Sequence, residues 1–96
     1  MKGYLVANLD IQDQPTFQRY REQVVPLIAK YGGRYIIRGG EVQELEGHLG
    51  RLIVLEFPSL EAARAFYESP EYQPVKAIRL QSATSDVALV VGYDDA

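Results

Sequence analysis

Residues 51–59 read Arg-Leu-Ile-Val-Leu-Glu-Phe-Pro-Ser, and this stretch decides the fold class more than any other. Its β-branched and aliphatic residues predict a strand over 51–57 whose two faces are both largely apolar. Pro58 ends that strand, and Ser59 is a suitable N-cap for a helix over 60–68. A strand followed at once by a helix indicates a protein with both a sheet and helices packed on it.

The same kinds of element recur on both sides of this stretch. Alternation predicts a strand over 3–10, and an apolar stripe at helical spacing predicts a helix between Asp13 and Gly32. The remaining predictions are strands over 34–38, 41–46 and 86–93, a bend at Gly39-Gly40, a hairpin turn over 47–50, a helical turn at 69–72, a last helix to about Leu80 and a solvated tail over 94–96. The order is β-α-β-β-α-β over one domain, residues 1–96. It is typical of the α+β, ferredoxin-like fold, with a four-stranded antiparallel sheet and both helices on one face.

Two helices cover only one face of such a sheet, and the strands do not supply a polar second face. We expect the helix side to hold Leu5, Ala7, Leu9, Tyr35, Ile37, Ile53, Leu55, Phe57, Val87, Leu89 and Val91. The opposite side then holds Tyr4, Val6, Asn8, Arg34, Ile36, Arg38, Leu52, Val54, Glu56, Ala88 and Val90. A face so rich in Val, Ile and Leu needs a cover, which predicts a homodimer joined through the open sheet faces.

The amino-acid composition argues against several kinds of chemistry. The chain has no Cys and one His, which argues against disulfides, thiolate metal sites and any site that needs two imidazoles. Ten Lys and Arg stand against 13 Asp and Glu, for a net charge of −3, so a nucleic-acid partner is not expected. No apolar run is long enough for a membrane span or a signal peptide. We therefore expect a cytoplasmic protein without a metal or other cofactor.

Several short segments follow one another in a family-specific order. They are Tyr31-Gly32-Gly33-Arg34, Arg38-Gly39-Gly40, Glu46-Gly47, Leu55-Glu56-Phe57-Pro58-Ser59, Ala62-Ala63 and Ser69-Pro70-Glu71-Tyr72. In these segments the chain resembles the bacterial domain-of-unknown-function family numbered 1330, in the dimeric α+β barrel superfamily. The resemblance covers nearly the whole chain and implies the ferredoxin-like fold and a sheet-to-sheet dimer. It implies no reaction, although the superfamily includes cofactor-independent monooxygenases, lactone isomerases and haem enzymes.

Glu56 and Arg38 are the candidate catalytic residues. Glu56 is an acid framed by apolar neighbours, so its carboxylate is either paired with an arginine or has a raised pKa. A carboxylate with a raised pKa could transfer a proton while Arg38 orients an anionic or enolate oxygen. The alternative is a structural ion pair between Glu56 and either Arg34 or Arg38. The segment Arg38-Gly39-Gly40 could also bind an anion, although a bulge explains the glycines as well.

Four further residues are candidate ligand-binding groups, namely Tyr4, Asn8, Tyr67 and Tyr72. Their phenol and amide groups could orient a small aromatic or carbonyl compound. His48 is expected in a solvated turn, and Arg51 in an exposed ion pair with Glu46. The sequence thus predicts a small homodimer with a pocket between each sheet and its helices. Isomerase- or monooxygenase-like proton transfer without a cofactor is one hypothesis, and non-catalytic binding of a ligand or protein is the alternative.

Overall fold

The predicted β-α-β-β-α-β order is confirmed, and the expected last helix lies before the final strand. A computed structural model describes residues 1–93. Its elements are β1 (Gly3–Ile11), α1 (Gln14–Lys30), β2 (Arg34–Arg38), β3 (Arg51–Phe57), α2 (Leu60–Glu68), α3 (Tyr72–Ser82) and β4 (Ala83–Val91). The expected helical turn and last helix form one element, α3, which contains Pro74 in its first turn.

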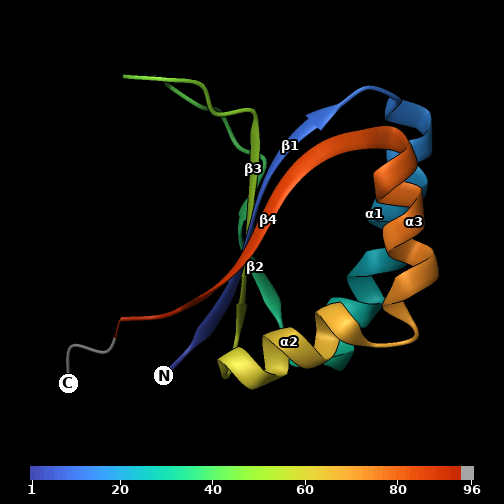
Figure 1. Cartoon of the computed structure of the whole chain (residues 1–96), viewed down its shortest axis with the longest axis vertical. Coiled ribbons are helices and arrows are strands. Elements are labelled where there is room, and N and C mark those ends of the chain that lie inside the picture. Colours follow the sequence, from blue (N-terminus) through green and yellow to red (C-terminus); the bar gives the residue numbers. More distant parts are fainter. Residues whose placement is uncertain (94–96) are drawn as a thin grey trace.

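The four strands form one sheet in the order β2-β3-β1-β4, and all neighbouring pairs are antiparallel. Figure 1 shows α1, α2 and α3 on the same side of this sheet, while the other side carries no helix. This is the ferredoxin-like fold that the element order predicted. One face of the sheet is therefore covered within the chain, and we call the other the open face.

Local sequence explains where the first two helices begin and where α1 ends. The Asp13 side chain accepts hydrogen bonds from the Thr16 backbone N–H and hydroxyl, which caps the start of α1. Ser59 caps α2 in the same way, through the backbone N–H of Ala62. Gly32 has φ +80°, a left-handed conformation that glycine adopts without steric cost, and it turns the chain out of α1.

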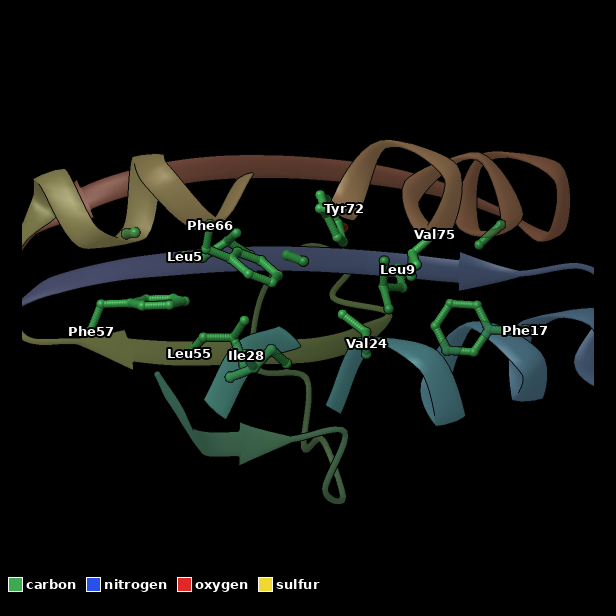
Figure 2. Packing of buried hydrophobic residues seen from close by; sticks show 13 residues of the cluster. Leu5, Leu9, Phe17, Val24, Ile28, Leu55, Phe57, Phe66, Tyr72 and Val75 are labelled. Carbon is green, nitrogen blue, oxygen red and sulfur yellow. The ribbon is translucent and has the colours of Figure 1, made fainter. Parts of the chain in front are cut away.

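The core lies between the sheet and the helices. Figure 2 shows Leu5 and Leu9 of β1, with Leu55 and Phe57 of β3, directed toward side chains of the helices. The helices contribute Phe17, Val24, Ile28, Ala63, Phe66, Tyr72 and Val75 to the same cluster. The predicted alternation of β1 is thus confirmed, because its buried positions recur at every second residue.

Three boundaries differ from the sequence predictions. Residues 39–50 form an irregular loop with no strand over 41–46, because glycines and exposed polar residues leave this segment without a strand partner. The last strand begins at Ala83 instead of 86 and ends at Val91, since β4 pairs with the whole length of β1. The expected solvated tail over 94–96 lies outside the described residues.

A bulge in β2 changes the expected faces of two residues. Tyr35 pairs with Leu55, but Ile37 pairs with Val54, so the register shifts between Tyr35 and Ile37. A shift of one residue turns every later side chain to the opposite face of a sheet. The prediction was therefore wrong for Ile37, which lies on the open face, and for Arg38, which pairs with Ile53 on the helix side.

Candidate functional site

A cleft separates the helix side of the sheet from α1 and α3, which is where the sequence predicted a pocket. The free space between its walls is about 40 Å³, and the cleft is partly open to solvent. Its lining residues are Leu5, Ala7, Leu9, Phe17, Tyr20, Arg21, Ile28, Tyr35, Arg38, Arg51, Ile53, Leu55, Phe66, Tyr72 and Arg79. Apolar side chains of the sheet and the helices make up most of this lining, and the polar groups are all arginines and tyrosines.

Arg79 is the most buried of the lining arginines. It lies on α3, and only 4% of the residue is exposed. Its Nη2 donates a long hydrogen bond of 3.4 Å to the Tyr67 hydroxyl, and its buried Nε has no partner. A buried charge normally has a hydrogen-bonded partner of opposite charge, because desolvation of an isolated charge is costly. None of the lining residues is an acid.

Three more guanidinium groups line the cleft from α1 and from the facing ends of β2 and β3. The Arg38 guanidinium lies 4.3 Å from the centre of the Tyr35 ring, and that of Arg21 lies 5.0 Å from the Phe17 ring. Arg51 packs against Gly39, and its Nε is buried without a hydrogen-bond partner. Partial burial and the neighbouring charges of Arg51 and Arg38 lower the pKa of Arg21 below its usual range.

Two tyrosines form a hydrogen-bonded pair on the helix side of the cleft. The Tyr20 and Tyr72 hydroxyl oxygens are 2.8 Å apart, which links α1 to α3. Burial raises the pKa of both phenols, and the effect is larger for Tyr20. Burial also raises the pKa of the half-buried Tyr35. The phenols are therefore neutral at physiological pH and suited to donating hydrogen bonds to a ligand oxygen.

The structure places Glu56 on the open face and not in the cleft. Its carboxylate accepts hydrogen bonds from Arg34 Nε at 3.0 Å and from the Tyr4 hydroxyl at 3.2 Å, and Lys2 Nζ lies 3.6 Å away. The Arg34 hydrogen bond, more than the Tyr4 bond, lowers the pKa of Glu56. Arg34 is thus the partner of Glu56, as the structural alternative anticipated, while the bulge places Arg38 on the other side of the sheet.

The remaining candidates divide between the two faces. Asn8 lies on the open face, where its Oδ1 accepts a hydrogen bond of 2.8 Å from the Gly50 backbone N–H and holds the end of the 39–50 loop. Tyr72 lines the cleft, and Tyr67 reaches it through its hydrogen bond with Arg79. His48 is exposed in the loop, as predicted, with Nδ1 2.7 Å from Glu44. Arg51 contributes to the cleft instead of pairing with Glu46, because residues 41–50 form no hairpin beside it.

Arg21, Arg51, Arg79, Tyr20 and Tyr35 were not predicted as site residues. Arg79 could have been found from periodicity, because the buried positions of α3 are Tyr72, Val75, Arg79 and Ser82. A charged residue on the buried stripe of a helix is unusual and indicates either a partner or a ligand. The other lining residues come together only through the tertiary arrangement of α1, β2 and β3.

Two kinds of feature are not found within residues 1–93. No group of three or more His, Cys, Asp or Glu side chains is arranged to hold a metal ion. No helix of this described part is long and apolar enough to cross a membrane.

The fold and the cleft together define a small ferredoxin-like α+β protein with an arginine- and tyrosine-lined cleft beneath its helices. Residues 2–93 match the model of one protein family, whose description reads "Domain of unknown function (DUF1330)", and the chain belongs to this family. The resemblance seen in the sequence segments is thus confirmed. No curated protein matches the sequence significantly.

Solved structures share the fold at low sequence identity. RPA0582 of Rhodopseudomonas palustris, described as a protein of unknown function, superposes with a TM-score of 0.78 at 16% identity over 97% of this chain and 83% of its own. SnoaB of Streptomyces nogalater, a cofactor-independent oxygenase, has a TM-score of 0.71 at 13% identity over 97% and 94%. A dimeric ferredoxin-like protein of unknown function from Jannaschia sp. CCS1 has a TM-score of 0.68 at 13% identity over 96% and 100%.

Proposed function

We propose that the protein is a homodimer joined through its open sheet faces, and that it binds a small organic molecule in the cleft of each subunit. The dimer is supported by the apolar side chains of the open face. The members of this set on the four strands are Val6, Ile37, Leu52, Val54, Ala88 and Val90, and 41% of Ile37 and 47% of Val90 are exposed. The similar protein from Jannaschia is itself described as dimeric.

The loop over 39–50 gives a second reason to expect a partner on that side. Figure 1 shows this green segment projecting beyond the sheet, away from the helices. Leu45 is 93% exposed, and Val42 and Leu49 are exposed as well. A largely polar loop that carries three exposed apolar side chains past an apolar face is suited to contact with a second copy of the chain.

Sedimentation equilibrium tests the dimer with one substitution on each side of the molecule. Val54→Asp places a charge in the middle of the open face, and we expect it to weaken dimerisation by at least tenfold. Val25→Asp on the outer side of α1, where Val25 is 39% exposed, is the matched control and should leave the dimer intact. A wild-type chain that sediments as a monomer at micromolar concentration would contradict the dimer.

The ligand cleft is supported above all by its unsatisfied polar atoms. Arg79 Nε and Arg51 Nε are buried without partners among the described residues, in a cleft that is otherwise lined by apolar and aromatic side chains and two further arginines. Ligand sites combine apolar walls with a few oriented polar groups. We expect benzamide, a small neutral aromatic probe, to shift the backbone NMR signals of cleft residues and to leave those of the open face unchanged. Spectra without shifts at cleft residues would contradict this site.

Conversion of the ligand without a cofactor is the second candidate function. It is favoured by the Tyr20–Tyr72 hydroxyl pair beside guanidinium groups, since both can stabilise an enolate oxygen as it forms. A hydroxide ion from the solvent takes the carbon-bound proton in this proposal, because the lining of the cleft contains no carboxylate or imidazole. The structural similarity to SnoaB agrees with this class of chemistry. In this proposal Arg38 orients the anionic oxygen, while Glu56, on the other face, stabilises the strands at the dimer interface. The open-face residues Tyr4 and Asn8 hold Glu56 and the loop, respectively.

Proton exchange tests the second candidate directly. Phenylacetone in deuterium oxide should exchange its acidic carbon-bound protons faster with the protein than in buffer. Arg38→Gln should reduce that additional rate at least tenfold, and Arg64→Gln on the outer side of α2 should not. An exchange rate equal to that of buffer would leave non-catalytic binding as the function.

A further inference from the structure

Positive charge is concentrated in the cleft, although the chain as a whole is negatively charged. Arg21, Arg38, Arg51 and Arg79 contribute four guanidinium groups to the lining, and no Asp or Glu joins them. The chain as a whole has a net charge of −3. The chain has 13 Asp and Glu residues that could form ion pairs with arginines. Even so, none of the four cleft arginines faces an acidic side chain across the cleft.

Arg79 is the lining arginine whose buried charge most clearly lacks a partner. Arg79 is almost fully buried, its Nη2 donates the hydrogen bond of 3.4 Å to the neutral Tyr67 hydroxyl, and its Nε has no partner among the described residues. Arginine stays protonated under all physiological conditions, so the charge cannot be relieved by loss of a proton. An anion bound next to Arg79 would supply the missing partner and accept a hydrogen bond from Nε.

The other three arginines are more exposed than Arg79 and also have no acidic partner among the described residues, although Arg21, on α1, donates a hydrogen bond of 2.8 Å to the Gln18 side chain. Arg21 and Arg38 lie over aromatic rings and Arg51 against the Gly39 backbone, so each head group is held in place without a carboxylate. Partial burial first, and then repulsion by the charges of Arg51 and Arg38, lowers the pKa of Arg21. A bound anion would reduce that repulsion as well.

The space near these charges is apolar and aromatic, so the anion belongs to a molecule with an apolar body. Leu5, Leu9 and Leu55 are buried on the sheet side, and the rings of Phe66 and Tyr72 pack on the helix side with centres 4.7 Å apart and planes tilted by 38°. We propose that the cleft selects an organic carboxylate with a flat apolar body, whose carboxylate is anchored by Arg79. This inference rests on the proposed ligand function and names the class of ligand.

Benzoate and benzamide test the inference because they have nearly the same shape and differ in charge. Each is titrated into the 15N-labelled homodimer, and binding is followed at backbone amides and at the arginine Nε–H signals. We expect benzoate to bind at least tenfold more tightly than benzamide, with the largest side-chain shift at Arg79 Nε–H. Benzylamine, the cationic counterpart, should not bind.

Variants of Arg79 separate the charge from the shape of the guanidinium. Arg79→Met keeps the volume of the side chain and removes its charge, and it should abolish the preference for benzoate over benzamide. Arg79→Lys should restore part of that preference. Arg64→Gln is the control, because Arg64 is exposed on α2 and pairs with Glu68 at 3.6 Å, outside the cleft. Should Arg79→Met fail to fold, Arg38→Gln at an exposed position of the lining should reduce the preference at least threefold.

The possible outcomes distinguish this inference from the proposed function. If benzamide binds the cleft as tightly as benzoate, the ligand site stands and the carboxylate inference is wrong. If Arg79→Met folds and still prefers benzoate tenfold, the assignment of Arg79 as the anchor is wrong. If no probe shifts any cleft signal, the ligand site itself is wrong, and the inference is overturned with it.

Discussion

The hydroxyl groups of Tyr20 and Tyr72 lie 2.8 Å apart and join α1 to α3 on the helix side of the cleft. Each phenol is a hydrogen-bond partner for the other in a place where water has little access. Removal of one hydroxyl leaves the other unsatisfied, which costs about 1–3 kcal/mol for a buried polar group. The pair is therefore a stabilising contact between helices as well as part of the cleft.

The first prediction concerns this pair. Tyr20→Phe should destabilise the protein by about 1–2 kcal/mol, because it leaves the Tyr72 hydroxyl without its partner. The double variant Tyr20→Phe/Tyr72→Phe should cost less than the sum of the two single variants, because no hydroxyl is then left unpaired. Urea denaturation of the wild type, the two single variants and the double variant measures this double-mutant cycle. Strictly additive free energies would contradict a coupled pair.

The second prediction is a pH dependence from Glu56. Its folded-state pKa is lowered by the Arg34 hydrogen bond first, so Glu56 holds its proton less tightly in the folded than in the unfolded state. The resulting stabilisation is present above the unfolded-state pKa and is lost as the pH falls through the folded-state pKa. The stability difference between the wild type and Glu56→Gln should therefore be largest near pH 6 and shrink below pH 4.

Urea denaturation from pH 3 to pH 6 measures that difference. Glu61→Gln is a suitable control, since Glu61 is exposed in the first turn of α2. If the difference in the free energy of unfolding between wild type and Glu56→Gln stays constant over this range, the Arg34–Glu56 contact does not stabilise the protein through its charge. In a Tyr4→Phe background, the effect of Glu56→Gln on the free energy of unfolding should be smaller, because one of the hydrogen bonds to the carboxylate is already absent.

The third prediction separates backbone strain from side-chain displacement at Gly39. Both Gly39 and Gly47 have positive φ, +68° and +73°, so alanine at either position should cost about 1 kcal/mol. A Cβ at Gly39 would meet the Arg51 guanidinium, whereas one at Gly47 would meet open space. Gly39→Ala alone should therefore shift the Arg51 Nε–H signal and weaken benzoate binding. Equal effects of both variants on that signal would contradict the packing of Arg51 on Gly39.

The fourth prediction concerns the contact between β1 and the start of α2. A Cβ on Gly3 would lie 2.5 Å from the Leu60 Cα, and the backbone atoms there cannot rotate away. Gly3→Ala should destabilise the protein by about 2 kcal/mol or more, since the helix must move away from the strand. Gly40→Ala, with no atom near its Cβ, should change stability by less than about 0.5 kcal/mol. Thermal unfolding of the two variants measures both.

The helix limits and the faces of the central strands followed from local sequence signals. Ser59 acts as a cap as predicted, the first helix begins at the predicted boundary next to Asp13, and the alternate residues of β1 are buried as predicted, because these features depend on neighbours in the chain. The burial of Arg79 could have been predicted in the same way, since helical spacing places it on the buried stripe of α3.

The rest of the site depended on information that local patterns do not carry. The register shift in β2 arises from pairing with β3, a strand thirteen or more residues further on, and it decides the face on which Arg38 lies. The loss of the expected strand over 41–46 likewise follows from the lack of a pairing partner. Glu56 and Arg38 could therefore be singled out as chemically interesting, but their separation by the thickness of the sheet could not be predicted.

The extra residue in β2 lets this strand change its length by one residue without changing the chemistry of the cleft. Removing Ile36 would restore an unbroken strand register and would leave Ile37 opposite Val54 and Arg38 opposite Ile53, as they are now. A strand of the same length without the bulge would instead pair Ile37 with Ile53 and Arg38 with Leu52, which would move the arginine to the open face. When sequences of the family are aligned, a one-residue gap at this strand is therefore compatible with a cleft arginine, and an arginine in the same column does not by itself show on which face it lies.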